Sequence, residues 1–389
     1  MLFRRELILV FSLLFLSKAG ISSVDYSNEK LSFCNSSNVN DYLNEKQIDE
    51  ISINIDNYRK WTKNYLEIIK SGKEIIPLKY KKKYKADIAV VFENELECTF
   101  PAKIRISGDL IDHIESEKIP LSSLDVELLN GNINSITRFK LLIPDSRNND
   151  NEIFVAKLMN HLGLLSPETF YVKTKFNGIQ YKYIFQEKPS KEFLERNHLR
   201  ESIILKGNER HAFQENSFNS RYVMSRPENP NWVKKNKQSF IISKKAIGTM
   251  NHAFLKNINI SQNYIPSERD LDLKILSNDN PYAISANQKY MALMYAMHAE
   301  HGLVINNRRF YYDPIYDYFL PIYYDGNANV LDAKFLKNSD DPEYFDLILR
   351  HDGDGIYVNR QPISSNEVIG AISALDSINN LNVNSFTDE

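Results

Sequence analysis

The chain has 389 residues, of which 42% are hydrophobic and 12% aromatic, and it carries 48 Lys and Arg against 50 Asp and Glu. This length corresponds to two or three domains or to one large domain with appendages, and the apolar content is enough for a sizeable core. A net charge of −2 gives no electrostatic argument for a nucleic-acid partner, so nucleic-acid binding is excluded from the expected functions.

Residues 1–23 have the pattern of a secretory signal peptide. Arg4 and Arg5 precede an apolar run over 7–16, and small residues follow it. The run is too short for a comfortable membrane span. We therefore expect a secreted, periplasmic or otherwise extracytoplasmic protein. An uncleaved N-terminal anchor is the alternative, and it would be the chain's only contact with a membrane.

The chain has two cysteines, Cys34 and Cys98. In an oxidising compartment they predict one disulfide between the N-terminal segment and a later strand. Two thiols without a Cys-x-x-Cys pair do not fit a zinc site.

Residues 24–86 are expected to form an N-terminal extension with one helix. The stretch "DNYRKWTKNYLEIIKSGK" predicts that helix, with Asp56 as its cap and Gly72 as its end. The basic run "KYKKKYK" at 79–85 indicates either a solvated face or a contact with an anionic partner.

From residue 87 the chain alternates between apolar and polar residues, which predicts strands, and 3.6-residue periods indicate helices between them. The turn Asn177-Gly178 predicts a hairpin. Residues 205–280 are expected to be an irregular insert, and 336–389 a helical tail capped by Ser364 with Glu367. The other predicted elements are the strands in "DIAVVFENELECTFPAKIRISG", "LSSLDVELLNG" and "ITRFKLLIP", and the helices "NEIFVAKLMNHLG", "PSKEFLERN" and "ISANQKYMALMYAMHAEHG".

The chain has no P-loop, Rossmann fingerprint, Gly-x-Ser-x-Gly or His-Glu-x-x-His motif. Two polar clusters stand at the ends of predicted strands. In "KIRISGDLIDHI" the turn at Gly108 is followed by Asp109, Asp112 and His113, which indicates either plain strand-to-turn punctuation or a loop near a charged ligand. In "RFKLLIPDSRNNDNE" a strand lysine, Lys140, precedes a helix that begins near Glu152.

The third cluster is the aromatic stretch "RRFYYDPIYDYFLPIYYDGN" at 308–327. Pairing of its two strands would bring Asn306 and Asn307 beside Asp325. An amide and a carboxylate side by side suit Mg²⁺. Protein kinases place a catalytic-loop Asn, two short strands and a metal-binding Asp in this order. The alternative is a structural core hairpin in which Asp-Gly only marks a turn.

The order of these blocks resembles the CotH kinase family, and the match covers about residues 88–330. In that family an Arg-containing strand ends in a glycine turn, two strands follow, a helix leads to a hairpin with an acidic hinge residue, and an Asn-containing strand precedes a metal-binding Asp. The corresponding blocks are "AKIRISGD", "SSLDVELL", "RFKLLIP", "YKYIFQEKPSKEFLE" and "NNRRFYYDP…FLPIYYDGN". The resemblance implies an α+β, two-lobed atypical kinase-like domain over 87–335, behind the N-terminal helical extension.

The resemblance also implies a function, namely transfer of phosphate from ATP-Mg²⁺ to Ser of a surface or envelope protein. Asp325 and Asn307 would hold Mg²⁺, and Asn306 would assist catalysis. The nucleotide would be bound by the loop at Gly108, by Lys140 with Glu152 as its partner, and near Glu187 at the hinge.

The sequence departs from the family at two places. The segment "AEHGLVINN" lacks the catalytic aspartate, so Glu300 or His301 would act as the base. Asp125 and Glu127 stand on the phosphate side, where basic residues are expected. A catalytically inactive CotH-like binding protein in envelope or surface-polymer assembly is therefore the alternative. A third possibility is a metal-dependent hydrolase or transferase that acts through Asp325, His301 and Asp109.

Overall fold

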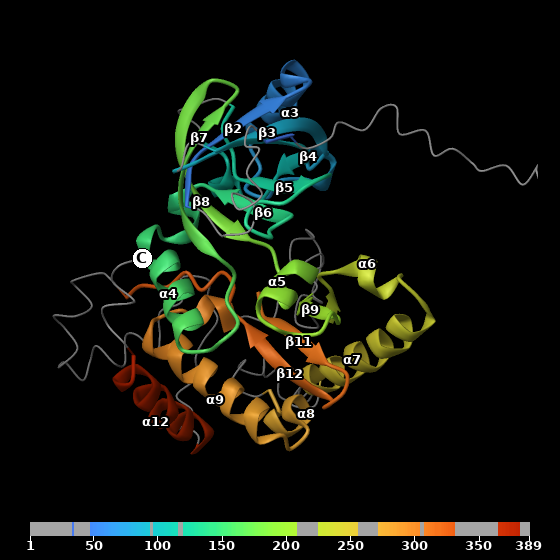
Figure 1. Cartoon of the computed structure of the whole chain (residues 1–389), viewed down its shortest axis with the longest axis vertical. Helices are drawn as coiled ribbons and strands as arrows, with labels where there is room; N and C mark the ends of the chain where they lie inside the picture. The colour runs from blue at the N-terminus through green and yellow to red at the C-terminus, as the bar shows by residue number, and fades with distance from the viewer. Residues whose placement is uncertain are drawn as a thin grey trace, which may run out of the picture.

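A computed structural model describes residues 33–34, 47–93, 96–115, 120–207, 225–255, 271–303, 307–330 and 365–381. The expected signal peptide, the candidate Asn306 and the expected cap Ser364 lie outside these residues. The described chain forms a barrel, a second sheet and helices around that sheet (Figure 1).

Seven strands close the barrel in the order β4-β3-β2-β7-β8-β6-β5, and β5 pairs back onto β4. All neighbours are antiparallel except β2 and β7, which are parallel. The strands are β2 (Ile48–Ile55), β3 (Tyr84–Phe92), β4 (Glu97–Ile106), β5 (Leu124–Leu128), β6 (Arg138–Leu142), β7 (Thr169–Phe176) and β8 (Ile179–Glu187).

The expectation of a two-lobed kinase-like fold is wrong, because the fold is α+β but is built around a closed mixed barrel. Closure depends on the ten residues of β4, whose first part pairs with β3 while Ala102–Ile106 also pair with β5. Alternation along a strand gives the same pattern in an open and a closed sheet, so the sequence did not reveal the barrel.

The segment before residue 87 contributes directly to the barrel. Strand β2 lies between β3 and β7, and helix α3 (Tyr58–Ser71) packs Trp61, Tyr65 and Ile68 into the barrel core. The predicted helix is confirmed and ends at Gly72, but its N-cap is Asn57 and not Asp56, because the Asn57 side chain accepts from the backbone N–H of Lys60. The short strand β1 (Phe33–Cys34) pairs with β4.

The expected disulfide between Cys34 and Cys98 is confirmed and fastens β1 to the barrel. No helix in the described part of the chain is long and apolar enough to cross a bilayer.

The second sheet is antiparallel, with the order β10-β9-β11-β12. Its strands are β9 (Ile204–Gly207), β10 (Ser225–Pro227), β11 (Arg309–Asp313) and β12 (Tyr318–Ile322). The α-helices of this half are α4 (Asp150–His161), α5 (Lys191–Arg196), α6 (Pro230–Val233), α7 (Lys237–Leu255), α8 (Leu273–Ser277), α9 (Pro281–Ala296) and α12 (Ser365–Asn379).

The expectation of an irregular insert over 205–280 is wrong for the residues of α7. This helix buries Ala246, Met250 and Ala253 against the second sheet. The period is helical, but lysines and serines between the apolar positions hid it in the sequence.

The aromatic hairpin pairs as predicted, from Arg309 opposite Ile322 to Asp313 opposite Tyr318. Every residue of β11 and β12 is buried. The rings therefore form core, and Asp325 follows the second strand where the chain returns toward the barrel.

Candidate functional site

Asp325 forms an ion pair with Arg147, which comes from the 3-10 helix η3 (Pro144–Arg147) between β6 and α4. Arg147 Nη1 lies 2.5 Å from Asp325 Oδ1, and the side chains are 8% and 13% exposed. Burial raises the pKa of the Asp325 carboxyl, but the charges of Arg147, His301 and Lys140 outweigh it and lower that pKa. The carboxylate is therefore ionised, and its backbone φ of 51° is in the left-handed region.

Three cations surround Tyr324, the residue before Asp325. Lys140 Nζ donates to the Tyr324 hydroxyl, Arg147 Nη2 lies 3.4 Å from the same oxygen, and the Arg309 guanidinium lies 3.1 Å from the ring centroid. Burial raises the pKa of Tyr324, but these cations lower it overall. We call Lys140, Arg147, Arg309, Tyr324 and Asp325 the junction cluster, because it joins barrel strand β6 to the end of the second sheet.

The junction cluster has unused hydrogen-bonding capacity. The Nε atoms of Arg147 and Arg309 are buried and have no hydrogen-bond partner in the part of the chain that the structure describes. Both residues are nearly inaccessible to solvent. A buried guanidinium N–H without a partner is costly, so an additional acceptor would be stabilised there.

Glu152 does not bond to Lys140. Its carboxylate accepts from Gln186 Nε2 at 3.0 Å and from the Tyr323 hydroxyl at 2.7 Å, deep in the core. Complete burial raises the pKa of Glu152, and Arg147 opposes that shift only in part. The lysine–glutamate pair expected from the resemblance is thus replaced by the Lys140–Tyr324 hydrogen bond.

The turn at Gly108 packs against His113, whose pKa responds to the charges of Arg147, Lys140 and Asp325 in the junction cluster. Gly108 has a φ of 86°, and a Cβ on it would lie 1.8 Å from the ring of His113, so this position requires glycine. His113 Nδ1 and Ser123 Oγ share a 3.0 Å hydrogen bond. Burial, with Arg147 and Lys140, lowers the pKa of His113 to about 3.

The remaining candidates divide between those near Asp325 and those away from it. Asn307 Nδ2 donates to the backbone carbonyl of His301 at 3.1 Å, which links the two residues. The charge of His301 contributes to the lowered pKa of Asp325. Glu300 lies 3.9 Å from His298.

The expected hinge residue Glu187 is directed into the protein. Its carboxylate binds Arg196 and accepts from the Glu168 N–H at 3.3 Å. Burial raises the pKa of Glu187 to about 7, against the effect of Arg196. Its side chain would have to leave these partners to touch a nucleotide.

The two acids on the phosphate side are neutralised by neighbours. Asp125 pairs with Arg105 at 2.5 Å and Lys188 at 2.9 Å, and these cations lower its pKa although burial raises it. Glu127 pairs with Arg138 at 2.7 Å and Lys83 at 2.6 Å. The repulsion expected between these acids and a triphosphate is therefore removed.

The described residues contain no group of three His, Cys, Asp or Glu side chains arranged to hold a metal ion. Asp325 faces Arg147, Asp109 faces Lys81, and His113 faces Ser123. These side chains do not fit a resident metal ion. The ATP-bound magnesium of a phosphoryl transfer is a different case, because it needs only one or two carboxylates beside the phosphates.

Sequence reasoning missed Arg147, Arg309 and Tyr324. Arg147 lies 178 residues from Asp325 in the chain, so no local pattern connects them. A signal did exist for Arg309, because an arginine within the all-buried run "RRFYYD" needs a buried partner.

No protein-family model matches the chain, and no curated protein matches its sequence. The resemblance to the CotH kinase family therefore stays a prediction.

Proposed function

We propose that the protein is an exported phosphotransferase that moves the terminal phosphate of ATP-Mg²⁺ to Ser of a surface or envelope protein. The proposal depends on the chemistry of the junction cluster and not on the fold, since the closed barrel is no support for a kinase. The observation that carries it is the convergence of Lys140, Arg147 and Arg309 on Tyr324, next to Asp325, with which Arg147 also forms an ion pair.

The charge balance of the cluster favours an anionic ligand, because the cluster contains three cations, Lys140, Arg147 and Arg309, and a single carboxylate, Asp325. Guanidinium groups bind phosphate oxygens through paired N–H donors, and lysine binds them as a point charge. The buried Nε atoms of Arg147 and Arg309 lack partners among the described residues, and a phosphate oxygen would supply one.

Binding of ATP-Mg²⁺ would exchange the partners of one ion pair. Without ligand, Arg147 neutralises Asp325. With ligand, Arg147 would turn to a phosphate oxygen, and Asp325 would meet the cation that the nucleotide carries. Arg147 and Asp325 would each have a partner of opposite charge with and without the ligand, so neither buried charge would be left uncompensated.

The missing catalytic aspartate leaves His301 as the base that we assign. The Asn307 side chain, just before β11, donates to the backbone carbonyl of His301 and fixes its position. A neutral imidazole could accept the hydroxyl proton of the substrate serine as the phosphoryl group is transferred.

The direct test is incubation of the mature protein with ATP labelled at the terminal phosphate. We expect label on protein with the wild type and none with Asp325→Ala. Asp317→Ala is the matched control, because Asp317 lies in the same hairpin with a similar φ of 58° but pairs with Lys245 outside the junction cluster. Equal labelling of wild type and Asp325→Ala would exclude the assigned site.

A second candidate is binding without transfer, as in an inactive CotH-like protein of envelope or surface-polymer assembly. The pairing of Arg147 with Asp325 favours it, since the carboxylate is already neutralised without a metal ion. In this case the wild type would bind ATP or another phosphorylated ligand, and no label would reach protein.

A further inference from the structure

Positive charge is concentrated in one short part of the chain. Residues 56–87 contain ten Lys and Arg against four Asp and Glu, whereas the whole chain has a net charge of −2. Such asymmetry raises the local concentration of anionic partners over that part of the surface. None of the Lys and Arg residues of 56–87 belongs to the junction cluster.

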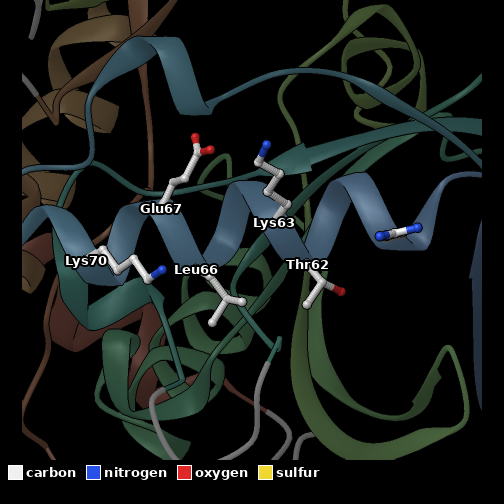
Figure 2. Close-up of a pocket in the computed structure, with 6 residues that line it drawn as sticks. Thr62, Lys63, Leu66, Glu67 and Lys70 are labelled. Carbon is white, nitrogen blue, oxygen red and sulfur yellow. The ribbon is translucent and has the colours of Figure 1, made fainter.

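Helix α3 presents part of this charge along one face. Arg59, Lys63 and Lys70 are exposed and line a groove of about 340 Å³ together with Thr62, Leu66 and Glu67. From Arg59 to Lys70 the helix rises about 16 Å, the length of a short extended segment. Figure 2 looks onto this face of the helix, with Lys63 and Glu67 along its upper edge and Thr62 and Leu66 along its lower edge.

The loop that follows α3 lies alongside it. Asn64 Nδ2 donates to the Tyr80 carbonyl at 2.8 Å, and the Trp61 and Tyr84 rings contact each other at 5.3 Å. This loop and the start of β3 add Lys79, Lys82 and Lys85, which are exposed, to the cations of the helix. We define the basic strip as Arg59, Lys63, Lys70, Lys79, Lys82 and Lys85, all of them exposed.

The basic strip leads to the turn beside the candidate site. Lys81, in the middle of the loop, forms an ion pair with Asp109, which directly follows Gly108. Lys83 reaches Glu127 on β5. The loop is thereby fastened beside the Gly108 turn on one side and beside α3 on the other.

We propose that the basic strip docks an acidic segment of the protein whose serine is phosphorylated at the junction cluster. The inference rests on the proposed function. It narrows the substrate class to proteins that carry a run of Asp or Glu near the target serine.

The groove fits a peptide better than a membrane or a uniform polyanion. The apolar side of α3 is in the barrel core through Trp61, Tyr65 and Ile68, and the exposed Ile69 and Leu78 are separate side chains and not the continuous apolar face that enters a bilayer. Leu66 and Glu67 stand among the cations of the groove. Leu66 can contact an apolar side chain of a peptide and Glu67 can accept from its backbone N–H donors, neither of which a chain of sulfates or phosphates offers.

The test is fluorescence anisotropy of the mature full chain with a labelled acidic peptide that contains one Ser, without ATP. We expect Arg59→Gln/Lys63→Gln/Lys70→Gln to bind about tenfold more weakly than the wild type, as does Lys79→Gln/Lys82→Gln/Lys85→Gln, because each variant removes three exposed attractions. The matched control is Lys234→Gln/Lys237→Gln/Lys244→Gln, which removes three exposed lysines near α7 and should bind as the wild type does.

Unchanged affinity in both basic-strip variants would overturn the proposal. Stronger binding to anionic lipid vesicles or to dextran sulfate than to the peptide, lost in the same variants, would overturn the choice of partner. The assay contains no ATP, so a protein that does not transfer phosphate can still bind the peptide. The proposed docking would then stand even if the proposed phosphoryl transfer failed, and Asp325→Ala should bind the peptide as the wild type does.

Discussion

The barrel interior and the junction cluster are both buried, but they are made of opposite kinds of side chain. The barrel buries Ile51, Ile53 and Ile88 with no exposed surface, and such burial is favourable by about 25 cal/mol per Å². The junction cluster buries guanidinium and carboxylate groups, whose desolvation can cost more than their pairing returns. The barrel therefore stabilises the fold, whereas the charges of the junction cluster are better explained by a ligand.

The largest effect is expected at Asp325. Asp325→Asn should lower phosphoryl transfer by about a hundredfold or more, because the group at the developing charge is lost. It should also lower the free energy of unfolding by about 3 kcal/mol, since it leaves Arg147 buried without a counter-charge. Activity assays and urea unfolding measure the two effects.

The double variant Asp325→Asn/Arg147→Met separates these effects. It should recover part of the lost stability, because the unpaired charge is gone, and recover no activity. Recovery of activity would show that Asp325 is only a structural partner of Arg147.

In the barrel we expect a substitution to change stability and to leave ligand binding unchanged. Ile88→Ala should lower the free energy of unfolding by about 2–4 kcal/mol, because it opens a cavity in a close-packed interior. The affinity for ATP should not change at temperatures where the variant is folded. Ile69→Ala, at a position 38% exposed on α3, is the control, and urea unfolding should show a much smaller loss in its free energy of unfolding. Loss of ATP affinity in Ile88→Ala would contradict the separation of the two regions.

His113 should give the junction a pH-dependent stability. Its pKa of about 3 in the fold lies below the ordinary value of 6.5, so the unfolded chain takes up a proton between these values and the folded chain does not. Stability therefore falls as the pH drops below about 6.5, by about 2 kcal/mol between pH 7 and pH 5.

Urea midpoints across this pH range for the wild type and His113→Asn measure the effect. In His113→Asn the stability should fall less between pH 7 and pH 5 than in the wild type. In His252→Asn, at an exposed position of α7, it should fall as much as in the wild type. Identical slopes for the wild type and His113→Asn would contradict the assignment.

The smallest effect is expected at Gly72, which ends α3 with a φ of 60° and where an added Cβ would meet no atom within 4 Å. Gly72→Ala should cost about 1 kcal/mol, from backbone strain alone. Gly248→Ala, inside α7 with equally open space, should stabilise by about as much. Thermal unfolding measures both changes in stability. If both substitutions stabilised the protein, or both destabilised it, the explanation by backbone conformation would be wrong.

The elements that local pattern predicts well are those whose partners are close in the chain. The turn Asn177-Gly178 predicted the β7–β8 hairpin, and the aromatic stretch predicted the β11–β12 pairing. Barrel closure was not predictable, because the β2–β7 contact joins residues more than a hundred positions apart. The same holds for the site, where Asp325 was predicted but Arg147, its partner across 178 residues, was not.

The central claim is that the junction cluster binds the phosphates of ATP-Mg²⁺. Calorimetric titration of the mature protein with ATP and Mg²⁺ tests it most directly. We predict saturable binding by the wild type, and affinity weakened about tenfold or more in Lys140→Met and in Arg147→Met, because each loses a charge-assisted contact. Lys182→Met is the matched control, since Lys182 also lies over a tyrosine ring, that of Tyr171, but outside the cluster. No binding by the wild type, or equal affinity in all four proteins, would contradict the claim.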